Sequence, residues 1–188
     1  MNIKKKMSTF YFALIDFHEY FLPTGTYAIK EWSVARIRPD LPVGSKHHVT
    51  KPICPWDQLE KTYQNYYNRK YQIYGVEWSA GTISLEETRQ YLTDFLSNAA
   101  IVYTRSVQKI NILTKFLDVQ LQVRPVDIDP ELCPKARSVV DCQFHNILFS
   151  NYCTKETVSQ MYRCLKSQVN SLQGESSKSL KRRLNSDD

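Results

Sequence analysis

Residues 10–17 read FYFALIDF, a nearly continuous apolar run close to the start of the chain. A run of this kind is typical of a strand that is buried on both faces of a sheet. The turn residues Pro23-Thr24-Gly25 follow, and residues 27–37 (YAIKEWSVARI) then alternate between apolar and polar side chains. The pattern predicts a second strand that pairs with the first through this turn.

The rest of the chain alternates between strand-like and helix-like patterns. Ser84 and Glu87 form a capping-box signature, and apolar residues at helical spacing follow them as far as Leu96. Strands interleaved with amphipathic helices predict an α/β fold, in which helices pack on the faces of a sheet. Further strands are predicted at residues 49–53, 100–103 and 123–128, further helices at residues 106–117 and from Thr154 onward, and residues 59–71 are predicted to be helical or irregular.

Length and charge indicate one folded unit with polar ends. The chain has 188 residues, and we expect a domain over residues 8–170 between a disordered start (1–7) and a disordered, Ser-rich basic tail (171–188). Of the net charge of +6, the start supplies +3 and residues 175–188 supply +1, which leaves +2 for residues 7–174. This balance argues against a strongly basic nucleic-acid-binding domain.

No secretory signal or membrane span is visible in the sequence. The longest apolar run near the start is far shorter than the roughly 20 residues that a membrane helix needs. We therefore expect an intracellular protein with no membrane partner, located in the cytoplasm, the nucleus or both. Residues 181–183 (Lys-Arg-Arg) are either a nuclear-import cluster or solubilising charge.

The cysteines favour metal binding over a disulfide framework. There are five, an odd number, in a chain without a secretion signal. Cys142, His145 and Cys153 have the spacing Cys-x2-His-x7-Cys, and two thiolates with one imidazole suit Zn²⁺, which takes four tetrahedral ligands. A fourth ligand would have to come from elsewhere in the chain.

A simpler interpretation applies to the other cysteines and histidines. Buried cysteine behaves as a small apolar residue, and we assign Cys54, Cys133 and Cys164 to that role. His47 and His48 lie between Pro- and Gly-containing segments and are predicted to be solvated rather than to bind metal.

Four segments together resemble the Maelstrom domain, an RNase H-like module related to DEDD-type 3′–5′ exonucleases. They read FYFALIDFHEY, YAIKEWSV, IVYTRSVQKINIL and CQFHNILFSNYC, and the resemblance spans roughly residues 9–166, without the HMG box that precedes the domain in well-known members. It implies an RNase H-like mixed sheet flanked by helices and a structural Zn²⁺. The family's ligand set falls here on Glu31, Cys142, His145 and Cys153, although a strand glutamate such as Glu31 more commonly faces solvent.

The carboxylates of a DEDD nuclease are largely missing. Such enzymes hold two divalent metals with four carboxylates. Asp16 matches the first of them, but His18 takes the place of the second and Arg105 lies where the third is expected. We therefore expect a degenerate nuclease fold without the standard catalytic site.

The resemblance implies a non-catalytic module that binds RNA, protein partners or both in small-RNA (piRNA) guided transposon silencing. The alternatives are a single-stranded ribonuclease with a non-standard site, and a mobile-element or viral relative that acts through protein contacts. Aromatic and basic residues of one segment form a candidate surface for weak binding of single-stranded RNA, or else a Tyr-rich helix packed on the sheet. The candidate RNA-binding residues are Lys61, Tyr66, Tyr67, Arg69 and Lys70.

Overall fold

The computed structural model describes residues 11–37, 44–125, 142–145 and 152–166. The predicted disordered ends, Cys133 and the last part of the strand predicted at residues 123–128 lie outside these ranges. Within them the chain forms a sheet with helices on both faces, which confirms the predicted α/β class.

The sheet is mixed and has five strands in the order β3-β2-β1-β4-β5. β1 and β2 form the predicted antiparallel hairpin, and β3 extends it antiparallel to β2. β4 lies parallel to β1, and β5 lies parallel to β4. The strands are β1 Phe12–Phe21, β2 Tyr27–Ile37, β3 Ser45–Val49, β4 Ile101–Thr104 and β5 Val123–Pro125.

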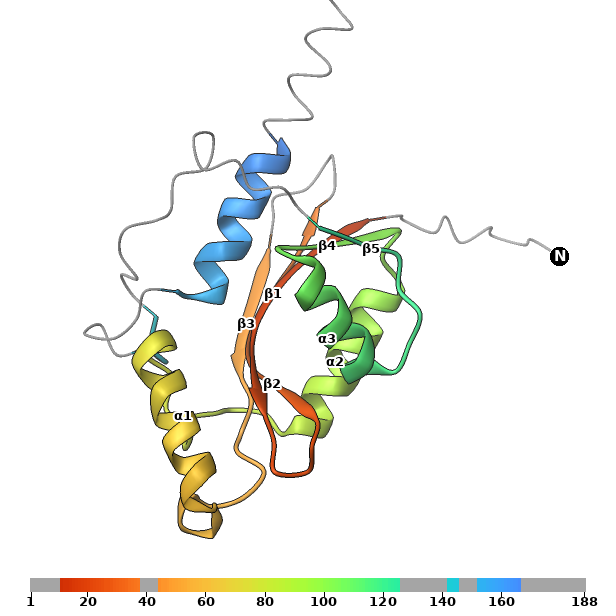
Figure 1. Ribbon diagram of the computed structural model, residues 1–188. Helices are drawn as coiled ribbons and strands as arrows, with labels where there is room; N and C mark the ends of the chain where they lie inside the picture. Colours follow the sequence, from red (N-terminus) through yellow and green to blue (C-terminus); the bar gives the residue numbers. More distant parts are fainter. Residues whose placement is uncertain (1–10, 38–43, 126–141, 146–151, 167–188) are drawn as a thin grey trace, which may run out of the picture.

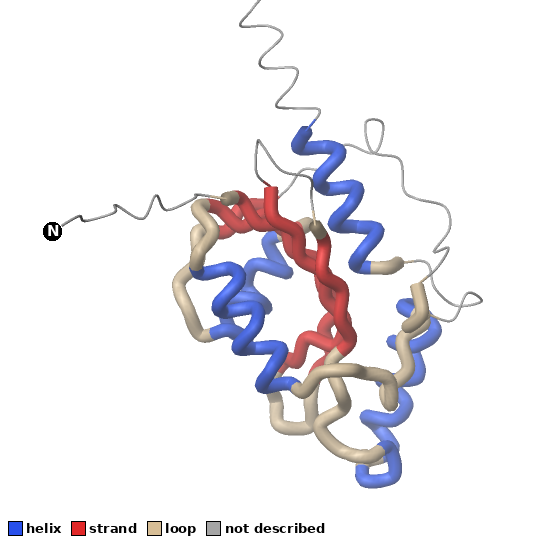
Figure 2. The backbone as a smooth tube through the Cα atoms, turned by 180° about the vertical axis from the view of Figure 1, so that it is seen from behind, coloured by secondary structure: helices blue, strands red, loops and turns tan. Residues whose placement is uncertain are grey.

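Helices cover both faces of this sheet. α2 and α3 lie together on one side, while α1 and the helix of residues 154–166 lie on the other (Figures 1 and 2). The predicted capping box of Ser84 and Glu87 starts α2, and Ser106 caps α3. The labelled helices are η1 Trp56–Gln58, α1 Lys61–Tyr74, α2 Leu85–Ser97 and α3 Val107–Leu117.

The apolar run of β1 serves two separate cores because successive strand side chains point to opposite faces. Ala13, Ile15 and Phe17 pack with α2 and α3. Leu14 packs with Met161 of the helix at residues 154–166. A strand covered on both faces needs apolar residues at consecutive positions, as the sequence pattern predicted.

The third strand differs from the prediction. It spans Ser45–Val49 rather than residues 49–53, because its pairing partner β2 selects a polar stretch (SKHHV) at the edge of the sheet. Of the predicted range, Val49 ends β3, and Thr50 forms an isolated bridge to Ile83. Edge strands take polar residues readily, so an apolar run is a poor guide to their position.

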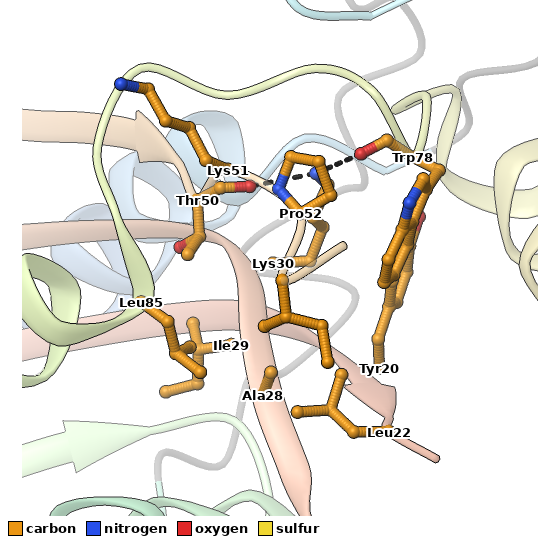
Figure 3. A pocket seen from close by; sticks show the side chains of 11 residues that line it. Tyr20, Leu22, Ala28, Ile29, Lys30, Thr50, Lys51, Pro52, Trp78 and Leu85 are labelled. Carbon is orange, nitrogen blue, oxygen red and sulfur yellow. Dashed lines mark hydrogen bonds between the residues drawn. The ribbon is translucent and has the colours of Figure 1, made fainter. Parts of the chain in front are cut away.

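A buried lysine connects β2 to the segments on either side of α1. The Lys30 ammonium donates to the carbonyl oxygens of Thr50, Trp78 and Ala80 at 2.8, 2.8 and 2.5 Å. Figure 3 shows the side chain reaching between Thr50 and Trp78 beside a cavity of only about 10 Å³, which is too small for an organic ligand. Burial lowers the pKa of Lys30 to about 7, while the three carbonyl acceptors favour its charged form.

Candidate metal centre

Five potential metal ligands from separate parts of the chain meet beside the helix of residues 154–166. Their donor atoms form two groups that share Cys153, and the atoms of each group lie within 4.8 Å of one another. One group is Glu31, His145 and Cys153, and the other is His47, Cys142 and Cys153. The structure therefore brings together all four predicted ligands, with His47 as a fifth potential donor, in groups that could hold a metal ion.

The Glu31 carboxylate is fully buried, in contrast to the solvent-facing position that is commoner for a strand glutamate. Its Oε1 atom accepts hydrogen bonds from the backbone N–H of Thr154 (3.1 Å), the Thr154 hydroxyl (2.9 Å) and His47 Nε2 (2.9 Å). Its Oε2 atom has no hydrogen-bond partner among the described residues. Three hydrogen bonds thus hold Oε1, while Oε2 can bind a further ligand.

His145 also has buried polar atoms that lack hydrogen-bond partners among the described residues. Neither ring nitrogen makes a hydrogen bond within the described part of the chain, although both are buried. Its Nε2 atom lies 3.2 Å from Glu31 Oε2, near enough for a shared cation but without hydrogen-bond geometry. Buried polar atoms without partners are uncommon, and a missing ion is one established reason for them.

A β-bulge lies next to Glu31 in the sheet. In the pairing of β1 with β2, His18 lies opposite Glu31 and Glu19 lies opposite Ile29, so Lys30 is an extra residue on β2. A bulge changes the direction of neighbouring side chains. Lys30 and Glu31 are both buried, in two different polar environments, within a strand whose residues 28–35 are all buried.

The prediction that His47 is solvated was wrong. Its side chain is only 11% exposed, and its Nδ1 atom lies 3.8 Å from Cys142 Sγ. Strand alternation separates it from His48, whose ring packs against Trp32 instead. Because β3 was predicted elsewhere, the sequence offered no register that would place His47 near Glu31.

Electrostatic interactions in the cluster favour the anionic forms of Glu31 and Cys142 but the neutral form of Cys153. Burial opposes ionisation of Glu31, but His18, His145 and His47 hold the pKa of its carboxyl well below the usual range. The hydrogen bond with Cys153 lowers the pKa of the Cys142 thiol, and the same interaction raises the pKa of Cys153. A divalent cation between the two sulfur atoms would favour the thiolate form of both.

Tyrosines of the predicted RNA surface pack against the sheet. Tyr67 is 2% exposed, and its ring stacks on Trp78 with a centroid distance of 4.1 Å. Its hydroxyl donates to the carbonyl of Phe21, whose N–H donates to the hydroxyl of the half-buried Tyr66. The Tyr67 ring is therefore not available to a base.

The three predicted basic residues all lie on α1 but differ in exposure. Lys61 and Arg69 are exposed, whereas Lys70 is half-buried and lies 3.7 Å from the carboxylate of Glu19. Its ammonium also lies over the ring of Tyr74, 5.3 Å from the centroid. The charge of Lys70 is therefore partly neutralised within the chain.

The single carboxylate that matches a DEDD nuclease is already bound to a cation. Asp16 is fully buried, and the ammonium of Lys109 donates to its Oδ1 atom and to the carbonyl of Phe17. An internal lysine thus neutralises this carboxylate. The sequence did not indicate this contact, because Lys109 lies on α3, far from Asp16 in the chain.

The remaining cysteines fit the sequence prediction only in part. Cys54 is a free, half-buried thiol. Cys164 is buried as expected but is disulfide-bonded. The expectation of a free apolar cysteine at Cys164 was wrong, since spacing along the chain does not reveal which thiols meet in space.

Comparison with known proteins adds no assignment. No family model matches the sequence, and no curated protein matches it significantly.

Proposed function

We propose that this chain is an RNase H-like, non-catalytic module that is stabilised by a structural Zn²⁺ and binds single-stranded RNA, protein partners or both in piRNA-guided transposon silencing. The observation that carries the zinc part is the pair of buried groups without partners, Glu31 Oε2 and the nitrogens of His145, beside two cysteines. The mixed sheet with helices on both faces supports the fold part. The Maelstrom-like sequence segments support the pathway.

The donor set fits zinc better than the hard cations. Two thiolates, one imidazole and one carboxylate suit Zn²⁺, whereas Mg²⁺ and Ca²⁺ prefer oxygen ligands. In this proposal Glu31, Cys142, His145 and Cys153 are the ligands. His47 and Thr154 hold the other Glu31 oxygen and orient the carboxylate, as outer hydrogen-bond partners of metal ligands do.

A site of this kind has a structural role. Four protein ligands leave no open coordination position for a water or a substrate. The proposed ligands come from β2, from residues 142–145 and from the position before the helix of residues 154–166. The ion would therefore fix this helix to the sheet.

The purified chain is expected to contain about one zinc ion per molecule. Elemental analysis after dialysis would measure the content. Replacing zinc with Co²⁺ is expected to give sulfur-to-cobalt charge-transfer bands and visible bands of a tetrahedral site. An octahedral cobalt spectrum, or zinc that is lost on dialysis, would contradict the assignment.

The same proposal predicts RNA binding without metal-dependent hydrolysis. End-labelled single-stranded RNA should bind at low salt, and it should stay intact with Mg²⁺ or Mn²⁺ because Lys109 neutralises Asp16. Anisotropy measures the binding and a denaturing gel measures the cleavage. A ladder of shortened products that disappears in Asp16→Ala would establish the ribonuclease alternative instead.

None of the helices in the described ranges combines the length and the apolar character needed to cross a membrane.

A further inference from the structure

A cleft of about 360 Å³ lies between the end of β1, the end of α1 and the start of α3. This volume falls within the range of about 300–1,000 Å³ that is common for small-ligand sites. It is separate from the space beside His47 and Cys142, and it contains none of the proposed zinc ligands. The lining residues used below are His18, Glu19, Tyr74, Arg105, Lys109 and Tyr152.

The charges around this cleft leave one cation unpaired. Glu19 is paired with Lys70 at 3.7 Å, and Lys109 is paired with Asp16. Arg105 is exposed and forms no ion pair or hydrogen bond with any residue that the structure describes. The cleft therefore has excess positive charge at Arg105, at the point where β4 leads into α3.

The start of α3 adds donors for an anion. α3 has 11 residues, its N-cap is Ser106, and its first turn contains no acidic residue. A helix of this length presents free N–H groups and a partial positive charge at its N-terminus. Lys109 contributes as well, since an ammonium has three donors and its contacts with Asp16 and Phe17 occupy two of them.

A largely buried histidine adds a polar group at the edge of the cleft. His18 is only 6% exposed and borders the cleft. Its Nε2 atom lies 3.3 Å from the carbonyl oxygen of Tyr152, but its Nδ1 atom makes no hydrogen bond with the described residues. This nitrogen is not one of the buried polar atoms that lack a partner, so it offers a contact to a ligand in the cleft without requiring one.

The same cleft offers flat surfaces beside the cations. The ring of Tyr74 stacks on His18 with a centroid distance of 3.8 Å and an interplanar angle of 18°. Tyr152 is 36% exposed, and Ile73 next to Tyr74 is 46% exposed. An aromatic ring next to unpaired positive charge is the combination that recognises a base and its phosphate in a single strand.

We propose that this cleft binds one phosphate and the adjacent base of a single-stranded nucleic acid, with Arg105 and the start of α3 contacting the phosphate and Tyr152 contacting the base. The inference rests on the proposed function for the expectation that RNA is the ligand. The proposed binding site is this cleft, which the last residues of α1 border, rather than the surface of α1 that the sequence predicted.

The experiment measures anisotropy of a labelled eight-nucleotide single-stranded RNA with the full zinc-loaded chain at low salt. Arg105→Ala is expected to weaken binding about fivefold to tenfold because it removes a phosphate contact. Arg105→Glu is expected to weaken binding further, because its carboxylate repels the phosphate. Tyr152→Ala is expected to weaken binding about tenfold through lost stacking. Arg163→Ala is the matched control, since Arg163 is also an exposed arginine but does not line the cleft, and Arg69→Ala tests the alternative surface on α1.

Competition identifies the source of the phosphate. Single-stranded RNA, single-stranded DNA, duplex RNA, a mononucleotide and inorganic phosphate are added separately, and melting temperature and zinc content verify each variant. Competition by both single strands and weak competition by duplex support the proposal. Displacement by phosphate alone, with no preference for a strand, would instead identify a simple anion site and overturn the nucleic-acid assignment.

Failure of the cleft and failure of the proposed function give different results. If wild type binds RNA and Arg69→Ala weakens it while Arg105→Ala does not, the cleft is wrong and RNA binding stands. If wild type binds neither RNA nor a mononucleotide, the cleft and the RNA-binding part of the proposed function are both wrong. Zinc content is unaffected by either result and tests the metal centre separately.

Discussion

Cys153→Ser is expected to abolish zinc binding and to prevent cooperative folding. Cys153 belongs to both groups of potential ligands, so its loss leaves neither group intact. Structural zinc in small domains provides on the order of 10 kcal/mol, which is comparable to the whole stability of about 5–15 kcal/mol of a typical domain. Circular dichroism melting and elemental analysis of the purified variant measure the two effects.

Cys54→Ser is the matched control, because Cys54 is a free thiol outside the cluster. It should retain zinc and melt close to wild type. Equal melting of Cys153→Ser and wild type would contradict a structural metal at this position.

His47→Gln tests whether His47 only orients Glu31 or is itself a zinc ligand. If His47 only holds Glu31, zinc affinity should fall about 10- to 100-fold while the tetrahedral cobalt spectrum persists. If His47 is itself a ligand, the spectrum should change with the donor set.

Lys30→Met is expected to destabilise the fold by about 3 kcal/mol or more, because it leaves three carbonyl oxygens, two buried and one partly buried, without a donor. Methionine fills a similar volume, so the effect reports the lost hydrogen bonds rather than a cavity. Urea unfolding at neutral pH measures the change. Lys51→Met is the control, since this neighbouring lysine is exposed and should have an effect within about 0.5 kcal/mol.

The difference in stability between wild type and Lys30→Met should also depend on pH. Burial lowers the pKa of Lys30 to about 7 from its ordinary value of 10.5, so between these values the unfolded state binds more protons at this residue. The stability of wild type relative to Lys30→Met should therefore rise with pH across this window. A flat difference between pH 7 and 10 would show that the three carbonyls keep Lys30 charged throughout.

The parts of the fold that local patterns determine were predictable from the sequence. The β1–β2 hairpin follows from an apolar run, a turn and an alternating run, and the capping box of Ser84 marks the start of α2. β3 was misplaced because its polar sequence becomes a strand only through pairing with β2. Pairing of an edge strand depends on the partner's backbone rather than on its own apolar residues.

The candidate metal site was predictable to a similar extent. The spacing of Cys142, His145 and Cys153 suggested three donors, and the Maelstrom resemblance supplied Glu31. The contribution of His47 depends on the register of β3, and the burial of Glu31 depends on the covering of both faces of β2. Both are consequences of tertiary pairing that no spacing along the chain reveals.

The short length of β4 has a consequence for self-association. β4 pairs with β1 only from Phe12 to Leu14, so the rest of β1 has no strand neighbour on that side within the described structure. An unprotected strand edge is a template for the strand of another molecule and a route to aggregation. Here the Lys109 ammonium donates to the carbonyl of Phe17. The Tyr66 hydroxyl accepts from the backbone N–H of Phe21, and the Tyr67 hydroxyl donates to its carbonyl. These side chains occupy backbone groups that a strand of a second chain would otherwise bind. The charge of Lys109 would also have to be buried before an intermolecular sheet could form there.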